Sequence, residues 1–138
     1  MICYRLHCPK CHYNLRFSQG VTMSFNKTNQ ELLEQMKNGE HGKIFERMAK
    51  EHPDAAAHHS HELFRCTACG ELSPRRTIEL IGADHSILAK KEHLCLRCNS
   101  QMELVDYDAY HYRGLNLPCP RCKENSEGLA RASVILVD

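Results

Sequence analysis

Cys66-Thr67-Ala68-Cys69-Gly70 is the stretch of this chain that most directly decides its fold. Two residues between the cysteines allow a tight turn that aims both sulfurs at one point, and glycine suits the left-handed backbone that closes the turn. The pattern occurs three more times, as Cys8-Pro9-Lys10-Cys11, Cys95-Leu96-Arg97-Cys98-Asn99 and Cys119-Pro120-Arg121-Cys122. Two such turns complete a tetrahedral shell of four thiolates around one ion. All eight cysteines are therefore predicted to bind metal, as ligands of two Zn²⁺ ions per chain.

The composition also favours a metal-held fold. The chain has 138 residues, of which 42% are hydrophobic and nine are cysteines. Without the cysteines the apolar share falls to about 36%, below that of ordinary folded domains, and such small chains commonly rely on disulfides or metal. The N-terminus does not read as a secretory signal, and no apolar run approaches a membrane span. We therefore expect a cytoplasmic protein without membrane contact, in which disulfides are rarely structural.

The remaining sequence predicts short strands and one helical hairpin. Residues 28–52 are expected to be helical, since Thr28 and Glu31 fit a capping box and Pro53 ends the second helix. The small and polar residues 53–61 are expected to form a linker. β-like segments are expected at residues 63–65, 77–81, 102–105, 115–117 and 133–137, and a β-rich knuckle at residues 1–25.

This organisation resembles the zinc-ribbon superfamily, whose members hold one zinc between two knuckles, each at a β-hairpin. Residues 1–82 also resemble the CpXC family of uncharacterised bacterial proteins, although Thr67 stands where that family has proline. The resemblance implies a small mixed α+β fold, stapled by metal, with two β-hairpin zinc ribbons and a helical-hairpin insertion. We expect the first ribbon within residues 1–82 and the second within residues 83–138, or both within one compact unit.

Spacing alone leaves open which pairs share an ion. A sequential arrangement joins Cys8 and Cys11 to the Cys66 pair and leaves the last two pairs together. A nested arrangement joins the two inner pairs and clamps the two ends of the chain at the second zinc; a cross-braced arrangement is the third option. We favour the sequential one because it closes shorter loops.

No enzyme motif is complete in this chain, so no catalytic residue is predicted. His61-Glu62 starts a metalloprotease motif, but Arg65 stands where the second histidine is required. Pro118 to Cys122 match the second half of a zinc deaminase signature, but no histidine in the chain is followed two residues later by the glutamate that the first half requires. A shell of four cysteines also leaves no position for water or substrate. Thiol chemistry is the remaining enzyme alternative, because Cys-Pro-Lys-Cys and Cys-Pro-Arg-Cys resemble the active sites of dithiol oxidoreductases.

The leading hypothesis is a zinc-binding protein that supports protein interaction, with nucleic-acid binding as the alternative. Residues 1–27 are basic and interleave aromatic with basic side chains, namely Tyr4, Arg5, Lys10, Tyr13, Arg16 and Phe17. However, eight thiolates and two zinc ions change the formal charge from +1 to about −3, whereas a phosphate binder usually has a basic surplus. We therefore rank a protein partner first.

Three further features are interpreted as structural. Lys10, Arg97 and Arg121 each precede the second cysteine of a pair, where a cation stabilises a tetrathiolate zinc of formal charge −2. The cluster His58, His59 and His61 is expected to be a solvated linker rather than a metal site. Cys3, the unpaired ninth cysteine, is expected to be a small apolar residue on the first strand.

Overall fold

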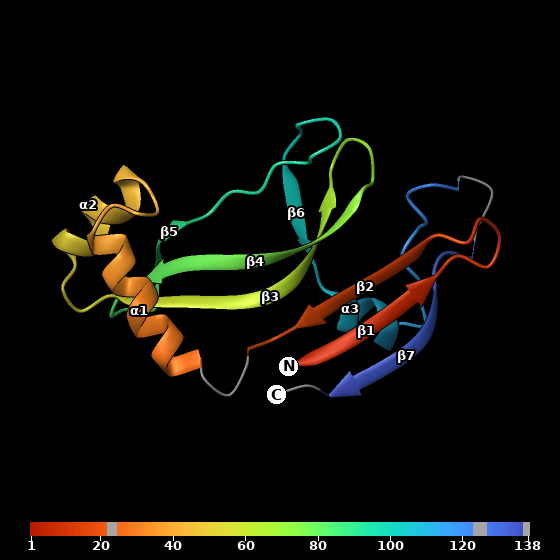
Figure 1. Cartoon of the computed structure of the whole chain (residues 1–138), viewed down its shortest axis with the longest axis horizontal. Coiled ribbons are helices and arrows are strands. Elements are labelled where there is room, and N and C mark those ends of the chain that lie inside the picture. The colour runs from red at the N-terminus through yellow and green to blue at the C-terminus, as the bar shows by residue number, and fades with distance from the viewer. Residues whose placement is uncertain (22–24, 123–126, 137–138) are drawn as a thin grey trace. The chain divides into compact units, whose positions relative to one another are not determined.

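The computed structural model describes residues 1–21, 25–122 and 127–136, and it has a mixed α+β fold with mostly antiparallel strands (Figure 1). Its helices are α1 (Phe25–Lys37), α2 (Lys43–Glu51) and α3 (Tyr107–Tyr112). Its strands are β1 (Ile2–His7), β2 (Asn14–Gln19), β3 (Ala56–Cys66), β4 (Leu72–Ile81), β5 (Ile87–Lys90), β6 (Met102–Val105) and β7 (Ala130–Leu136). The predicted fold class, a small mixed α+β chain, is confirmed at this level.

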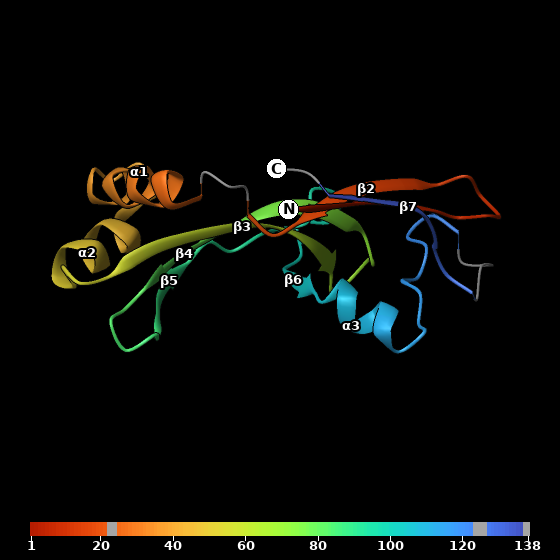
Figure 2. The ribbon, with the colours of Figure 1, turned by 90° about the horizontal axis from the view of Figure 1, so that it is seen from below.

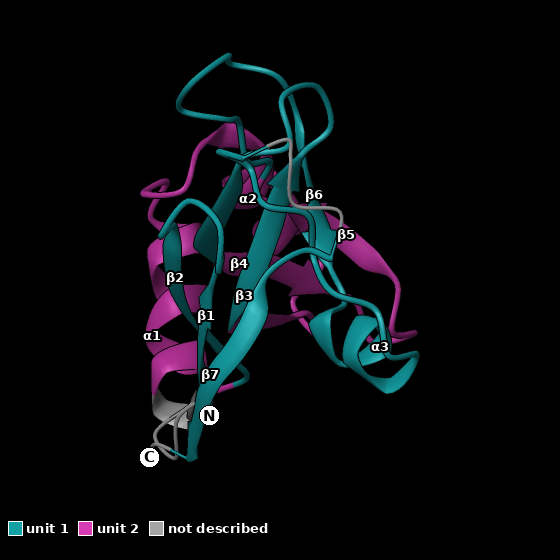
Figure 3. Ribbon diagram, turned by 90° about the vertical axis from the view of Figure 1, so that its right-hand side faces the viewer, with its two compact units in different colours: residues 1–20, 61–75, 92–138 teal, residues 21–60, 76–91 magenta. Residues whose placement is uncertain are grey.

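The chain divides into two compact units (Figure 3). The first comprises residues 1–20, 61–75 and 92–138, and the second comprises residues 21–60 and 76–91. This division differs from the expected boundary after residue 82. The reason is that β7, near the end of the chain, pairs with β1, near its start, so that the two ends belong to one sheet.

In the first unit, β2, β1 and β7 form a three-stranded antiparallel sheet in that order. Tyr4 and Phe17 face each other across β1 and β2, and both are buried together with Leu6 and Leu15, their neighbours on the same face. Helix α3 lies on one side of this sheet (Figure 2). Its Tyr107 ring lies 4.8 Å from the Tyr4 ring, so the helix closes the core of the first unit.

The same unit contains the end of β3, the start of β4, and β6. Leu63 to Cys66 of β3 pair antiparallel with Met102 to Val105 of β6. Phe64, Cys66, Cys95 and Met102 form a small buried cluster between these segments. Cysteines thus lie within the packed interior of the unit, which places their sulfurs where other side chains restrict their positions.

The second unit contains α1 and α2, together with the start of β3, the end of β4, and β5. Its core includes Leu32 and Met36 from α1 and Phe45 from α2, packed with Ile78 and Leu80 of β4. The helical hairpin predicted for residues 28–52 is confirmed, and α2 ends at Glu51 as expected. Helix α1 begins at Phe25 instead, because residues 25–27 contain neither glycine nor proline and the helix continues through Thr28.

Three segments differ from the sequence-based expectations. The prediction of a linker at residues 53–61 is wrong, because β3 begins at Ala56. Its alternate residues Ala57 and His59 are buried, as in a strand with one buried face. No strand is assigned to residues 115–117, where the Leu117 carbonyl instead accepts a hydrogen bond from the Leu129 N–H. The last strand begins at Ala130 rather than Ser133, and residue 137 lies outside the described residues.

No helix within the described ranges is both long enough and apolar enough to cross a membrane.

Candidate metal centres

Cys66, Cys69, Cys95 and Cys98 bring four sulfurs together in the first unit, each within 4.8 Å of the others. The Cys66 and Cys98 sulfurs are 3.4 Å apart, and those of Cys69 and Cys95 are 3.7 Å apart. A regular tetrahedron with Zn–S bonds of about 2.3 Å requires sulfur separations of about 3.8 Å. A disulfide requires about 2.05 Å. The four free thiols therefore have the spacing of a metal shell and not that of disulfides.

Three of the cysteine pairs have the same backbone turn. In each, the N–H of the first cysteine donates to the carbonyl five residues later: Cys8 to Tyr13, Cys66 to Glu71 and Cys95 to Ser100, each at 2.8 Å. The residue after the second cysteine has a left-handed backbone in all three, namely His12, Gly70 and Asn99, with φ of 63°, 79° and 61°. The left-handed turn predicted at Gly70 and Asn99 is confirmed. It also occurs at His12.

Backbone N–H groups of these turns point at the cysteine sulfurs. The N–H groups of Ala68 and Cys69 lie 3.4 Å from the Cys66 sulfur, and the Arg97 N–H lies 3.4 Å from that of Cys95. Such donors stabilise sulfur in its thiolate form, which is the form that binds metal. The donor set and its surroundings therefore fit a thiophilic ion such as zinc.

Cys8, Cys11 and Cys119 form a second group, with sulfurs also within 4.8 Å of one another. The Cys11 and Cys119 sulfurs are 3.4 Å apart. Cys122, the eighth predicted ligand, is partly buried against the same core but is not within this spacing. It directly precedes residues 123–126, which lie outside the described residues. Seven of the eight predicted ligands are thus brought together in two groups.

These groups correct the favoured pairing. Cys8 and Cys11 lie beside Cys119, and the Cys66 pair lies beside the Cys95 pair, so the arrangement is nested rather than sequential. The physical reason is the sheet: β1 pairs with β7, and this pairing brings the N-terminal knuckle to the C-terminal one. Loop length is a weak guide to which pairs share an ion, since the entropy of loop closure changes only slowly with length.

The pKa values of Cys98, Cys69 and Cys11 are shifted by their surroundings. Hydrogen bonds from the Ser100 side chain and backbone lower the pKa of Cys98 to about 6. The backbone N–H of Glu71 favours the Cys69 thiolate, but burial and the neighbouring sulfurs outweigh it and raise the pKa of Cys69 to about 11. In the same way, the Tyr13 N–H favours the Cys11 thiolate, while burial and the Cys119 and Cys8 sulfurs raise its pKa to about 12. Each group therefore contains a thiol whose pKa is raised, Cys69 in the first group and Cys11 in the second.

Glu71, which the sequence did not single out, connects the basic residues of two knuckles. Its carboxylate lies 3.4 Å from the Arg97 guanidinium and 2.7 Å from that of Arg121, and its side chain is only 12% exposed. Arg121 also lies over the Tyr13 ring, 5.5 Å from its centre. The interpretation of Arg97 and Arg121 as cations that serve the metal groups is consistent with these positions. In the sequence, the only signal for Glu71 is its position two residues after Cys69, at the end of the knuckle.

The other candidate ligands are not brought together. Within the described ranges, the two cysteine groups are the sets of three or more possible ligands at metal-binding spacing, and His58, His59 and His61 are not among them. His59 is buried, and its Nδ1 lies 2.7 Å from Asn29 Oδ1. Cys3 is half-buried on β1 opposite Ser18, as expected for a strand residue.

Of the three interleaved aromatic residues of the basic N-terminal segment, Tyr4, Tyr13 and Phe17, two are not available to a ligand. Tyr4 and Phe17 are 4% and 2% exposed and belong to the core. The Tyr4 hydroxyl donates to Asp108 at 2.9 Å, and burial together with this contact raises the pKa of Tyr4 to about 12. Arg5, Lys10 and Arg16 are exposed. The interleaving seen in the sequence therefore reflects the alternation of a strand with one buried face.

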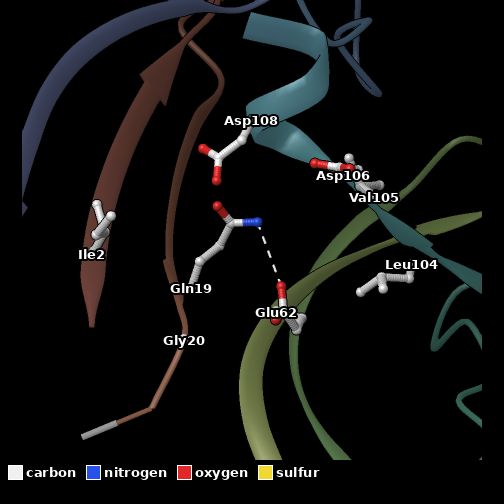
Figure 4. A pocket seen from close by; sticks show the side chains of 8 residues that line it. All are labelled: Ile2, Gln19, Gly20, Glu62, Leu104, Val105, Asp106 and Asp108. Carbon is white, nitrogen blue, oxygen red and sulfur yellow. Dashed lines mark hydrogen bonds between the residues drawn. The ribbon is translucent and has the colours of Figure 1, made fainter. Parts of the chain in front are cut away.

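A pocket of about 420 Å³ lies apart from the cysteines in the same unit, and three carboxylates line it (Figure 4). Each has a structural partner. Glu62 accepts a hydrogen bond from Gln19 at 3.4 Å, Asp106 accepts one from the Ala109 N–H at the start of α3, and Asp108 accepts the one from Tyr4. These contacts account for the acidic residues through the fold.

Within the residues that the structure describes, none of the four cysteine pairs opens a helix. Cys8 and Cys11 lie between β1 and β2, the Cys66 pair lies between β3 and β4, and the Cys95 pair lies between β5 and β6. Cys119 follows the irregular segment after α3. A dithiol active site uses the N-terminus of a helix to lower the pKa of its nucleophile, and this arrangement lacks that feature.

In comparisons with known proteins, no family model matches this chain, and neither a curated protein nor a solved structure matches it. The resemblances to zinc ribbons and to the CpXC family therefore remain predictions from the sequence.

Proposed function

We propose that this protein binds two zinc ions at structural four-cysteine sites and that the metal-held unit is a binding module for another protein. The observation that carries the proposal is the set of four free sulfurs of Cys66, Cys69, Cys95 and Cys98, at the spacing of a tetrahedral shell. Four protein ligands leave no coordination position for water or substrate. The metal then supplies stability and fixes the knuckles, rather than chemistry.

The second zinc is assigned to Cys8, Cys11 and Cys119, with Cys122 as its fourth ligand. This assignment gives both ions the same donor set and makes each site a zinc ribbon built from two knuckles. Metal analysis of protein purified without added zinc is expected to find about two zinc ions per chain, with Cys3 as the remaining reactive thiol. Disulfides in place of metal would contradict the proposal.

A protein partner is favoured by the surface beside the Cys95 knuckle. Leu96, at the tip of this turn, is 89% exposed, and Leu94 just before it is 48% exposed. Apolar side chains held on a rigid turn lose little conformational freedom when a partner covers them. Affinity purification from the native cell, with and without nuclease, is expected to recover protein that survives the nuclease. Recovery that disappears with nuclease treatment would favour nucleic acid instead.

Nucleic-acid binding through residues 1–27 is a second candidate, and one observation favours it. Arg5 and Arg16 lie directly opposite each other on β1 and β2, and both are exposed. Like charges at this position destabilise a sheet, and a phosphate between them would relieve the repulsion. Residues 1–27 contain no acidic residue, although residues 22–24 lie outside the described part of the chain.

Burial of Tyr4 and Phe17 removes two of the three interleaved aromatic side chains from base stacking, so this candidate rests mainly on phosphate contacts. Its test is fluorescence anisotropy with a single-stranded oligonucleotide at about 50 mM salt, where changing both Arg5 and Arg16 to Ser should abolish binding. Arg113→Ser, which changes an exposed arginine just after α3, is the matched control. Absence of binding by the unaltered protein at low salt would dismiss the candidate.

A further inference from the structure

The residue that closes the Cys66 knuckle also reaches the other cysteine group. The backbone carbonyl of Glu71 accepts the Cys66 N–H at 2.8 Å, and its backbone N–H donates to the Cys69 sulfur. Its side chain extends from this fixed backbone to Arg121, with 2.7 Å between Oε2 and Nη1. Since Arg121 lies between Cys119 and Cys122, a residue positioned by one group contacts a residue positioned by the other.

Tyr13 has the same role in the Cys8 knuckle. Its carbonyl accepts the Cys8 N–H at 2.8 Å, and its backbone N–H donates to the Cys11 sulfur. The Arg121 guanidinium lies over the Tyr13 ring, 5.5 Å from its centre. Arg121 therefore contacts the side chains of both closing residues, Tyr13 and Glu71. The contacts run continuously from one cysteine group to the other within a single compact unit.

We propose that metal binding at the two cysteine groups is coupled through Arg121 and Glu71, so that filling either group strengthens binding at the other. This inference rests on the proposed function, since it requires metal at both groups. The coupling arises because a bound ion fixes its knuckle, and the ion pair forms fully only when both knuckles are fixed. The first ion therefore removes part of the ordering cost that the second would otherwise meet.

Glu71 also has an electrostatic role at this junction. A tetrathiolate zinc carries a formal charge of −2. Arg97 and Arg121 each directly precede the second cysteine of a pair, and the two pairs belong to different groups. The Glu71 carboxylate, 12% exposed, holds both guanidinium groups at distances of 3.4 Å and 2.7 Å. Because Arg97 and Arg121 are 57% and 42% exposed, solvent weakens these ion pairs, and we expect a coupling of about three- to tenfold in affinity.

A thermodynamic cycle tests the coupling. Zinc affinity of the Cys66 group is measured by chelator competition in the full chain, with the Cys8 group intact or disabled by Cys119→Ser. Glu71→Gln keeps the backbone of the knuckle and the size of the side chain but removes its charge. With both groups intact, this variant should weaken zinc binding about three- to tenfold. With Cys119→Ser, it should have much less effect.

Native mass spectrometry supplies a second readout that does not depend on the Cys119→Ser variant folding. During zinc titration, Glu71→Gln and Arg121→Gln should each raise the proportion of chains that carry one zinc. Glu103→Gln, which changes an exposed acid on β6 of the same unit, is the matched control and should titrate like the unaltered protein.

The outcomes separate the coupling from the proposed function. An unaltered chain that binds no zinc would overturn both. A chain that binds two zinc ions with identical titrations for Glu71→Gln and the unaltered protein would overturn the coupling alone. Equal weakening by Glu71→Gln, with and without a functional Cys8 group, would also overturn it, because the effect would then be local.

Discussion

The two cysteine groups differ in how much of the chain each one closes. Cys69 and Cys95, which join the knuckles of the Cys66 group, are 26 residues apart, whereas Cys11 and Cys119 are 108 residues apart. The first group can form from one continuous segment. The second joins two distant segments that the pairing of β1 with β7 brings side by side. One group is therefore a local staple and the other a clamp.

The groups also differ in exposure. Cys69 and Cys98 of the local staple are exposed, while the clamp has Cys8 and Cys119 buried and Cys11 half-buried. A metal in the staple is therefore nearer to solvent and to chelators. The two groups of one compact unit therefore differ in their access to solvent.

The largest expected effect separates the two compact units. All nine cysteines lie in the first unit, since residues 21–60 and 76–91 contain none. Removing metal with a strong chelator should therefore abolish the protection of β1, β6 and β7 in hydrogen-exchange mass spectrometry. Helices α1 and α2, whose core contains no cysteine, should keep most of theirs. Equal loss of protection in both units would contradict this division.

The next prediction compares one ligand from each group. Cys119→Ser and Cys98→Ser should each lower the zinc content to about one ion per chain, but Cys119→Ser should destabilise the protein more. The additional loss is about 1 kcal/mol, because the clamp closes the longer loop of 108 rather than 26 residues. Chemical unfolding of the two variants, each with one zinc bound, measures the difference. Equal stabilities would show that loop length does not distinguish the groups.

How far the sequence allowed these groups to be predicted depends on the residue. The spacing of the cysteines predicted all seven residues that meet in the two groups, and Gly70 and Asn99 predicted the left-handed turns. Pairing was not predictable, because it depends on β1 joining β7 across almost the whole chain. The pattern of one strand carries no information about its distant partner.

Glu71 and His59 illustrate what local pattern leaves out. Glu71 is one of many acidic residues in the sequence, and its importance appears only when Arg97 and Arg121 meet it in space. His59 lies in a stretch of small and polar residues that suggested a linker. It lies in β3 instead, where it is buried and contacts Asn29. Tertiary packing overrides composition in both cases.

Exposure predicts the order in which the sulfurs react. Limited treatment with N-ethylmaleimide in the presence of a weak chelator should label Cys98 severalfold faster than Cys8 and Cys119, because Cys98 is exposed and its pKa is lowered to about 6, whereas the other two are buried. Cys3, which belongs to neither group, serves as an internal reference. Peptide mapping by mass spectrometry measures the rates. Faster labelling of Cys8 and Cys119 would contradict the burial of these two sulfurs.

The smallest expected effect is a change in the slope of the pH dependence. The metal-free Cys11 and Cys69 thiols have pKa values of about 12 and 11, so both are protonated at pH 7 and must lose their protons to bind zinc. Cys98, with a pKa of about 6, is already ionised there. Zinc affinity should therefore fall as pH is lowered from about 8 to 5, and for the staple the fall should steepen below the pKa of Cys98, where this thiol must also lose a proton. Proton release in weakly buffered solution measures this change, and release of no protons would contradict it.

The central claim is that the cysteine pairs are nested: the two inner pairs hold one metal ion, and the two outer pairs hold the other. Changing Cys8, Cys11, Cys119 and Cys122 together to Ser leaves the staple complete but removes the clamp. Elemental analysis of this variant should find one zinc per chain, held by Cys66, Cys69, Cys95 and Cys98. Sequential or cross-braced pairing would break both sites in the same variant, so a metal-free protein would contradict the account.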